Sequence, residues 1–321
     1  MKPPYEITAL ILDLYGQISE KLGQCRTLGL SKPEAKLRRQ NRIKTIHSSL
    51  AIEGNSLAID DVTALLDNNR VIGPVKEIRE VKNAITAYEQ IGKYSHLSQK
   101  DFLVAHRALM DGLIPEAGKY RRKAVGIVKG QVVRHIAPAA EMVPSLMKDL
   151  FKYLQTDKDL LIIKSCVFHY EMEFIHPFED GNGRMGRLWQ TRILMAIHPV
   201  FEYVPVEETI RKKQVEYYKA LEASDSSGKS TVFIEFMLSA INESLGLVLG
   251  STKAIKIDLE KRYEKALDEM EGWFVRKKYM QINKGISGAT ASRDLKAMVE
   301  RGLVETEGIG RMKKYRKRTR K

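Results

Sequence analysis

Apolar residues recur at intervals of three and four positions through most of the chain before residue 250. Side chains at this spacing lie on one face of a helix, so the pattern predicts a mainly α protein whose helices each bury one apolar stripe. The predicted helices are Ile7–Leu22, Val75–Ile91, Gln99–Leu113, Val143–Leu154, Leu160–Glu173 and Val232–Leu249.

One segment departs from the helical pattern. Residues Ala124–Ile136 contain two runs rich in Val and Ile on either side of Lys129-Gly130. That pair suits a tight turn, so the segment predicts a β-hairpin. An isolated hairpin among helices has two interpretations, an incidental edge hairpin or a segment with a specific task.

Composition narrows the class of protein. The two cysteines, Cys25 and Cys166, belong to no CxxC pair and to no Cys/His cluster, which argues against a disulfide scaffold and a structural zinc site. The first residues lack the features of a signal peptide, and no run of about 18 uninterrupted apolar residues occurs. We therefore expect a cytoplasmic protein without a membrane partner.

The charge is unevenly distributed along the chain. The formal net charge of 321 residues is +14, and residues 273–321 hold 15 Lys and Arg against 4 Asp and Glu, so +11 of it lies there. About two domains are expected at this length. With a boundary near Gly250, we expect an N-terminal helical region over residues 1–95, a helical core over 96–250, and a linker helix with a small basic domain over 251–321.

The most informative segment is FIHPFEDGNGRMGR, residues 174–187, between two helical patterns. Gly181 and Gly183 permit positive φ and close backbone approach, so successive N–H groups can converge on an anion where a helix begins. Arg184 and Arg187 lie on one face of that helix, where two guanidinium groups suit a polyphosphate. The segment predicts a site for several phosphates.

Three neighbours supply the remaining chemistry. Asp180 would be repelled by bound phosphates unless a hard cation lay between them, which predicts Mg²⁺. Asn182 can donate to a phosphate oxygen, and His176, projecting beside the site, can act as a general base. Taken one at a time, these features have ordinary interpretations: the glycines could form a simple turn, the histidine could be a buried core residue, and the arginines could be solvated. The segment lacks the lysine of a Walker A motif, and no strand is predicted before it. These two features argue against a P-loop and against a Rossmann dinucleotide site.

The same residues resemble the motif HxFx(D/E)GNGRxxR of the Fic family, matched by His176, Phe178, Asp180, Gly181, Asn182, Gly183, Arg184 and Arg187. The resemblance implies an all-helical Fic core, ATP and Mg²⁺, and transfer of AMP to a Ser, Thr or Tyr hydroxyl of a protein. It implies that His176 is the base and Asp180 the Mg²⁺ ligand. The glycines, Asn182, Arg184 and Arg187 would bind the phosphates, with Phe178 packed beneath the loop.

The resemblance extends over about residues 102–197. It includes Gly118-Lys119-Tyr120-Arg121 and makes the hairpin similar to the family's flap, which pairs with the target segment by strand addition. The expected flap residues are Val125, Gly126, Ile127 and Val128. His169, seven residues before His176, is expected to have a structural role.

A second segment, Ser49 to Asn55 (SLAIEGN), ends a helical run that starts near Pro33. Without other context, Glu53 in this segment would be interpreted as a solvated carboxylate at a helix end. Beside a Fic motif the segment resembles the family's inhibitory (S/T)xxxE(G/N) motif through Ser49, Glu53 and Gly54. That resemblance implies that Glu53 pairs with Arg187 and obstructs the placement of the ATP γ-phosphate.

The basic end of the chain follows a different pattern. A turn at residues 287–292 opens the helix Ala291–Glu300, a short strand follows, and Gly308-Ile309-Gly310 forms a hairpin tip. This order resembles a winged helix-turn-helix domain. The resemblance implies that Thr290, Ser292, Arg293 and Lys296 face the DNA major groove; the alternative is a protein-binding domain of the same fold.

These observations lead to one reading and to alternatives. The chain is expected to be a protein adenylyltransferase inhibited by Glu53, with a winged helix-turn-helix at its end. One alternative is a DNA-binding regulator whose Fic core senses a nucleotide. Another is transfer or removal of a different phosphate-linked group, such as UMP, phosphocholine or phosphate. A homodimer is common in the family, but no segment of this chain establishes one.

Overall fold

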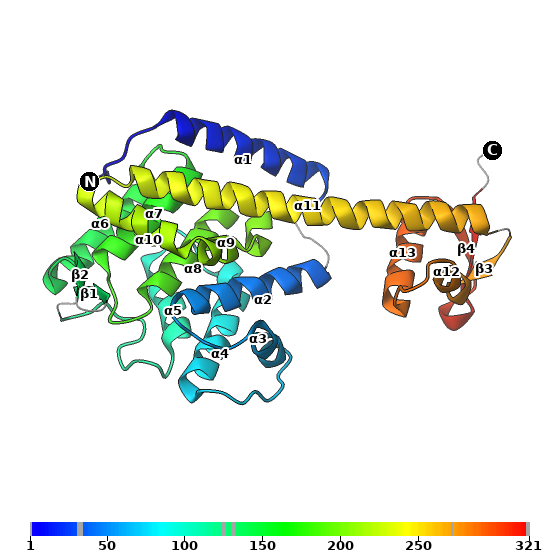
Figure 1. The fold of residues 1–321 in the computed structure, drawn as a ribbon, viewed down its shortest axis with the longest axis horizontal. Helices are drawn as coiled ribbons and strands as arrows, with labels where there is room; N and C mark the ends of the chain where they lie inside the picture. Colours follow the sequence, from blue (N-terminus) through cyan, green and yellow to red (C-terminus); the bar gives the residue numbers. More distant parts are fainter. Residues whose placement is uncertain (1, 31–34, 124–125, 130–131, 271, 319–321) are drawn as a thin grey trace. The chain divides into compact units, whose positions relative to one another are not determined.

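The chain forms two compact units, Met1–Leu247 and Val248–Lys321. The structure is a computed structural model that describes residues 2–30, 35–123, 126–129, 132–270 and 272–318, with the backbone alone at 126–129, 132–136, 253–258 and 311. We describe each unit by itself (Figure 1).

The first unit is helical apart from one hairpin. Its elements are α1 Ala9–Thr27, α2 Ala35–Ile52, α3 Ile59–Leu66, α4 Val75–Glu89, η1 Ile91–Lys93, α5 Gln99–Met110, β1 Gly126–Lys129, β2 Val132–Ile136, η2 Ala140–Met142, α6 Val143–Thr156, α7 Leu161–Ile175, α8 Asn182–Met195, η3 Pro199–Tyr203, α9 Val206–Lys212, α10 Gln214–Ser227 and the start of α11 Thr231–Glu269. Each helix predicted from the apolar spacing is present, with ends that differ by a few residues except for α11, which extends 20 residues beyond Leu249.

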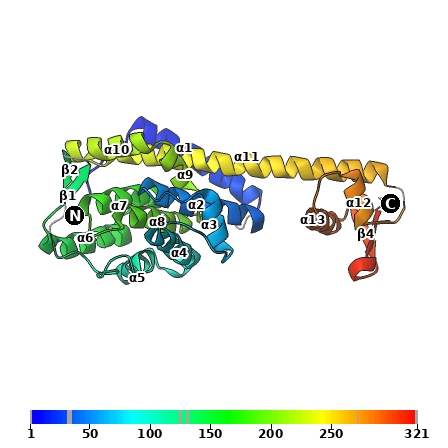
Figure 2. The same ribbon diagram turned by 60° about the horizontal axis from the view of Figure 1, so that its bottom comes forward.

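Helices α7 and α8 form the centre of this unit. Figures 1 and 2 show them between the first part of α11 on one side and α4 and α5 on the other. Both helices are buried on most sides, and Phe168 and Trp189 are 0% exposed. Phe102 of α5 packs edge-on against both rings, at centroid distances of 6.0 and 5.1 Å. The loop that joins α7 to α8 is therefore anchored at both ends in the close-packed core.

Helix α11 is longer than the sequence suggested. Two helices were expected, on either side of Gly250, but residues 231–269 form one helix. A single glycine in a helix interior costs only about 1 kcal/mol, less than the burial of apolar residues such as Phe233, Ile241 and Leu245 contributes. Residues Thr231–Thr252 are also long and apolar enough to span a membrane by length and composition, but more than half of that stretch is buried in the fold, as in a core helix.

Strands β1 and β2 pair antiparallel within the segment where a hairpin was expected. The register pairs Gly126 with Ile136 and Lys129 with Val132, with an irregularity after Ile127. The expected turn residue Gly130 and the flap residue Val125 lie outside the described residues. The hairpin is inserted between α5 and α6, so its two ends return to the helical core.

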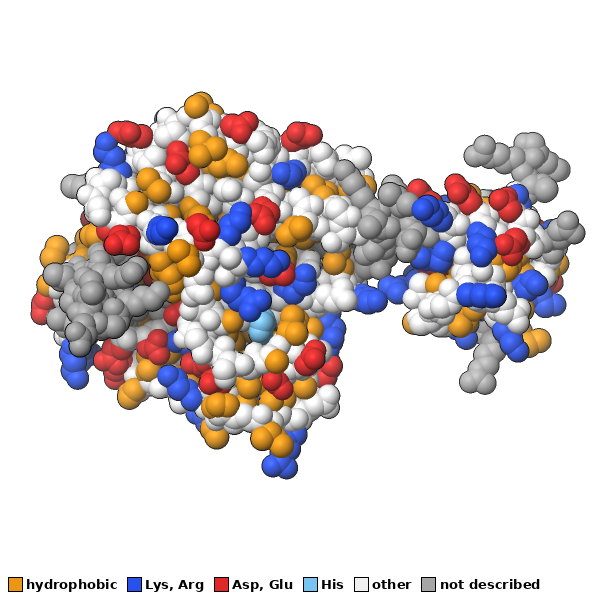
Figure 3. Space-filling model, in the orientation of Figure 1, with side chains coloured by type: hydrophobic (Ala, Val, Ile, Leu, Met, Phe, Trp, Pro, Cys, Tyr) orange, Lys and Arg blue, Asp and Glu red, His pale blue; other side chains and the backbone are white. Residues whose placement is uncertain are grey.

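The second unit contains the end of α11 and a small sheet. Its further elements are β3 Phe274–Val275, α12 Arg276–Ile282, α13 Gly288–Glu300, β4 Val304–Glu307, η4 Gly310–Met312 and β5 Lys314–Lys317. The three strands form an antiparallel sheet in the order β3-β5-β4. Buried residues of both helices, including Tyr279, Leu295 and Met298, share one core with Val304. Lys and Arg side chains are numerous on the face of this unit seen in Figure 3.

A buried carboxylate fixes α13 against α11 and α12. The side chain of Asp294 is 2% exposed, and its Oδ2 accepts hydrogen bonds from Arg262 Nε at 2.8 Å and from the Tyr279 hydroxyl at 3.0 Å. An unpaired charge in such a position is costly. This network therefore sets the orientation of α13 within the second unit.

We predict that Arg262→Ala lowers the free energy of unfolding of the second unit by about 3 kcal/mol, because it leaves Asp294 buried without its cation. Trp273 fluorescence during urea unfolding measures this, in a Trp189→Phe background shared by all variants. Lys296→Ala is the control. It removes a surface pair with Glu300 at 3.7 Å and should cost less than about 1 kcal/mol. Equal losses in both variants would contradict the proposed importance of the buried network.

Candidate active site

The loop between α7 and α8 contains two left-handed residues. His176 caps the end of α7 with φ 49° and ψ 61°, and Gly181 precedes α8 with φ 83°. A positive φ is easy for glycine but uncommon for histidine, and such residues often lie at functional sites. The two turns let the chain leave α7 and enter α8 within six residues, with the first N–H groups of α8 lacking partners inside the helix.

Asn182 maintains the shape of this loop. Its Oδ1 accepts a hydrogen bond from the Phe178 N–H at 2.9 Å, and its Nδ2 donates to the Phe178 carbonyl at 3.0 Å. The residue is 2% exposed. Its amide is therefore bonded to the loop backbone, and the expected contact with a phosphate oxygen stays a prediction.

His106 of α5 contacts the loop through its ring and through a hydrogen bond. The sequence patterns did not indicate this residue as part of the site. Its ring stacks on Phe178 with the centroids 3.5 Å apart. Burial lowers the pKa of His106 to about 4, so the ring is neutral at neutral pH. Its Nδ1 accepts from the Gly118 N–H at 2.9 Å, and the Nε2–H donates to the Asp180 carbonyl at 3.0 Å. No motif marks this residue, because its partners lie far away in the sequence.

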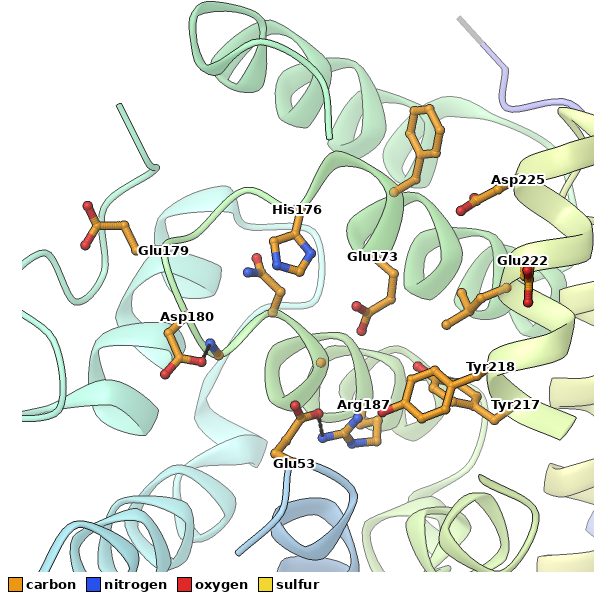
Figure 4. A pocket seen from close by; sticks show the side chains of 15 residues that line it. Glu53, Glu173, His176, Glu179, Asp180, Arg187, Tyr217, Tyr218, Glu222 and Asp225 are labelled. Atoms are coloured by element: carbon orange, nitrogen blue, oxygen red, sulfur yellow. Dashed lines mark hydrogen bonds and ion pairs between the residues drawn. The ribbon is translucent and has the colours of Figure 1, made fainter. Parts of the chain in front are cut away.

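A pocket opens beside the loop (Figure 4). Its walls come from the end of α2, the end of α7, the loop, the start of α8, and α10. The lining residues are Glu53, Glu173, Phe174, His176, Glu179, Asp180, Gly181, Asn182, Gly183, Arg187, Tyr217, Tyr218, Leu221, Glu222 and Asp225. The structure thus brings together most of the residues predicted for the site. Arg184 is not among the lining residues, and it is 5% exposed.

Arg187 is bonded to both residues of the predicted inhibitory motif. Its Nη2 donates to Glu53 Oε1 at 2.7 Å and to the Ser49 carbonyl at 2.8 Å, and its Nε donates to the Ser49 hydroxyl at 3.1 Å. Burial opposes the charge of this guanidinium, but Glu53 and other nearby anionic groups raise its pKa above the ordinary value. Arg187 is therefore a buried cation whose partner is a carboxylate from α2.

Glu53 also covers the start of α8. A Cβ on Gly183 would lie 2.3 Å from Glu53 Oε1, so no other residue type fits there without moving that carboxylate. Glu53 accordingly lies against the backbone that the sequence predicts to bind phosphate. One side chain occupies both the guanidinium and the space over the helix start.

Arg184 is bonded to two carboxylates. It donates to Asp180 Oδ1 at 2.8 Å and approaches Glu80 of α4 at 3.4 Å. Glu80 also accepts a hydrogen bond from the Asn55 amide at 2.8 Å. The segment that carries Glu53 is thereby connected to Arg187 and Arg184 of α8, directly to the first and through Glu80 to the second. The Asp180 side chain stays 43% exposed.

A second carboxylate in the pocket wall belongs to Glu173. Burial would raise its pKa, but the nearby His169, whose Nε2 lies 3.7 Å from Glu173 Oε1, together with His176 and Arg187, holds it below the ordinary value. His169 is 0% exposed and its Nδ1 lies 2.7 Å from the Gln190 side-chain oxygen. His169 therefore packs in the interior, in keeping with its expected structural role.

The remaining predicted residues lie elsewhere. Gly126, Ile127 and Val128 form part of β1, and only their backbone is described. Thr290, Ser292, Arg293 and Lys296 lie on α13 of the second unit.

The fold and the loop together define a mainly helical protein in which a glycine-containing helix start lies beside a histidine. Residues 96–194 match the model of the Fic/DOC family. A Fic family protein from Desulfovibrio desulfuricans G20, of known crystal structure, is 38% identical, with a TM-score of 0.76 over 100% of this chain and 99% of that one. The chain belongs to the Fic family.

The curated relatives are more distant. Protein adenylyltransferase fic-1 of Caenorhabditis elegans is 28% identical over 233 residues, and protein adenylyltransferase Fic of Nematostella vectensis is 28% identical over 273 residues. The matched parts are 68% and 77% of this chain but only 43% and 59% of those proteins. A structure of C. elegans Fic-1, 24% identical, has a TM-score of 0.61 over 76% of this chain and 72% of that one, which shows likeness of fold alone.

The low pKa of His106 makes a prediction about pH. This residue binds a proton near pH 4 in the fold but near 6.5 in the unfolded chain. Its contribution to stability is therefore complete above pH 6.5 and is lost as the pH falls toward 4. We expect His106→Asn to be less stable than wild type at neutral pH, but to lose less stability between pH 7 and 5, by roughly 2 kcal/mol. Urea unfolding between about pH 7 and 5 tests this, and parallel pH profiles would contradict it.

Proposed function

We propose that this protein is an adenylyltransferase that moves AMP from ATP to a Ser, Thr or Tyr hydroxyl of a protein. The observation that carries the proposal is that His176, the start of α8 and the buried Arg187 line one pocket. A base and an anion site are then within reach of the same bound molecule. Relatives named protein adenylyltransferases match the chain at 28% identity, which supports the same reaction class.

The chain's own groups account for the requirements of the transfer. The N–H groups at the start of α8 and the Arg187 guanidinium would bind the phosphates. The target hydroxyl oxygen attacks the α-phosphorus, its proton moves to the His176 imidazole, and the bond to the β-phosphate oxygen breaks to release pyrophosphate. Such a reaction depends on positioning and charge stabilisation more than on covalent chemistry of the protein.

Magnesium fits the donor set beside this loop. Asp180 offers a carboxylate that stays 43% exposed at the pocket, and Mg²⁺ is commonly held by one or two carboxylates plus phosphate oxygens. Among the described residues no cluster of three or more His, Cys, Asp or Glu could hold a metal ion by itself. We therefore propose that Asp180 binds the ion together with the nucleotide. The ion would supply charge neutralisation at the phosphates.

The hairpin is the proposed docking element for the target. Its described strands, β1 and β2, pair only with each other, so each has a further edge at which an extended segment could add by main-chain hydrogen bonds. Strand addition would align a hydroxyl with His176 largely independently of the flanking side chains. Gly126, Ile127 and Val128 are the proposed contacts on β1, with Val125 just before it.

Glu53 is the proposed inhibitor of this activity. Its bond to Arg187 at 2.7 Å removes a cation that the phosphates need, and its charge repels theirs in a partly desolvated pocket. Ser49 completes the arrangement by accepting from the same guanidinium. The resting protein would therefore bind ATP in a poorly productive way until α2 moves or Glu53 is removed.

We predict that Glu53→Gly raises ATP-dependent transfer by at least about tenfold, because a difference of 1.4 kcal/mol already corresponds to that factor. Glu53→Gln, which keeps the size but loses the charge, should give a smaller increase. His176→Ala should abolish transfer in either background. The measurement is incorporation of α-labelled ATP into a bacterial lysate, with intact mass to identify the group. Equal labelling by wild type and Glu53→Gly would contradict the inhibition, and no labelling by Glu53→Gly would contradict the activity.

A second candidate function, DNA binding, is favoured by the exposed face of α13. Ala291, Leu295 and Met298 of this helix are buried, whereas Arg293 and Lys296 are exposed. Ser287 caps the helix start by accepting from the Thr290 N–H at 3.1 Å. A capped helix with a basic exposed face, followed by a two-stranded β4–β5 wing, suits the major groove. The proposal is a winged helix-turn-helix that binds duplex DNA.

The polar residues at the start of α13 fit this proposal in part. The Ser292 hydroxyl accepts from Arg276 of α12 at 2.9 Å, so it helps to join the two helices. Lys296 has a side chain that is 78% exposed and lies 3.7 Å from Glu300. Arg293 and Lys296 are therefore the groups best placed to meet phosphates or base edges, with Thr290 beside them.

We predict that Arg293→Ala/Lys296→Ala weakens binding to a labelled duplex of about 30 base pairs and lowers the salt dependence of log Kd by about 2, one per lost phosphate contact. Lys261→Ala/Lys265→Ala is the control with the same loss of charge from exposed residues of α11. Fluorescence anisotropy at several salt concentrations measures both. Equal effects of the two double variants would contradict the α13 site, and undetectable binding would contradict DNA as the ligand.

A further inference from the structure

Arg121 is a buried cation that the proposed chemistry does not use. It follows α5, is 3% exposed and does not line the pocket. Every hydrogen bond described for its guanidinium ends on a backbone carbonyl. A buried guanidinium bonded in this way holds backbone segments together through a planar fork of donors.

The carbonyls belong to two different parts of the site. On one side, Nε donates to the His176 carbonyl at 2.7 Å and Nη2 to the Ile175 carbonyl at 3.3 Å. On the other side, Nη1 donates to the Lys123 carbonyl at 2.9 Å and Nη2 to the Pro138 carbonyl at 2.6 Å. One planar group thus spans the end of α7 and both ends of the hairpin.

The end of α7 has a particular need for such a partner. The last carbonyl groups of a helix accept no hydrogen bond from within the helix. They also carry the negative end of the helix dipole, which favours a nearby cation. His176 also adopts a left-handed conformation that must be held by its surroundings. A further hydrogen bond, from the Arg121 N–H to the Pro177 carbonyl at 2.9 Å, fixes the next residue of the loop.

The other two carbonyls, those of Lys123 and Pro138, flank the hairpin. Lys123 precedes β1 and Pro138 follows β2, so the guanidinium holds the two points at which the hairpin leaves the core. The same group therefore sets the distance between the hairpin and the backbone of His176.

We propose that Arg121 is a positioning residue that couples the hairpin to the imidazole of His176. In this role, which rests on the proposed transferase function, it places a target strand so that its hydroxyl meets the base. Binding of ATP does not depend on it, because no atom of Arg121 reaches the pocket. The expected signature is a loss of transfer rate without a loss of nucleotide affinity.

The test compares Arg121→Lys and Arg121→Gln with Arg122→Lys and Arg122→Gln, all in the Glu53→Gly background. Arg122 is the exposed neighbour and serves as the matched control. We expect the Arg121 variants to lose roughly 10²-fold in transfer of label to lysate proteins, since a displacement of about 1 Å can have that effect. Their Kd for ATP with Mg²⁺, measured by calorimetry, should stay within about twofold of the parent. Arg121→Lys should keep more of the transfer rate than Arg121→Gln but less than the parent, because all donors of a lysine side chain are on one nitrogen atom.

A second readout does not require activity. Among the seven histidines, the imidazole signal of His176 in labelled protein is identified as the one missing from His176→Ala. That signal should shift in Arg121→Lys and stay in place in Arg122→Lys, with no nucleotide present. This separates the two proposals, because a parent that fails to transfer AMP leaves the spectroscopic comparison intact.

Three results would overturn the positioning role. The first is equal transfer rates and His176 signals in the Arg121→Lys and Arg122→Lys proteins. The second is a loss of ATP affinity in parallel with the loss of rate. The third is global unfolding of both Arg121 variants in circular dichroism, which would make Arg121 a residue required for folding instead.

Discussion

The buried positive charge of Arg187 is the constraint on which the site depends. A guanidinium whose side chain is 1% exposed needs an anion beside it, since an unpaired buried charge is among the most expensive features of a fold. In this structure the anion is Glu53, assisted by the hydroxyl and carbonyl of Ser49. Phosphate oxygens could satisfy the same donors, so carboxylate and nucleotide would compete for one cation.

The backbone of the loop imposes a second condition. Left-handed residues at both ends of the loop bring the chain from α7 into α8 within a short distance. Asn182 bonds the loop to itself, and His106 bonds it to α5. These contacts hold the loop backbone through neutral groups, whereas the charged groups beside it are paired with one another, Arg187 with Glu53 and Arg184 with Asp180. A bound anion would have to take the place of a carboxylate beside one of these arginines.

The two units of the chain hold their helices together in different ways. The first surrounds the loop between α7 and α8 with helices, and α7 and α8 themselves are buried on most sides. The second is small and uses a buried Asp294 with Arg262 and Tyr279 to hold its helices, because few apolar residues are available to a unit of this size. Its exposed surface remains free for basic side chains such as Arg293 and Lys296, which are the basis of the proposed DNA contact.

The sequence by itself determined the local chemistry. The loop residues are contiguous, so their spacing already implied an anion site at a helix start, with His176 beside it. The helices were predictable because apolar periodicity is a local signal, although Gly250 did not end α11 as expected. The resemblance to the inhibitory motif had already implied the pairing of Glu53 with Arg187, which the structure contains. Only the tertiary structure decided that His106 and Arg121 meet the loop, because packing of the core, and no spacing along the chain, brings them within bonding distance.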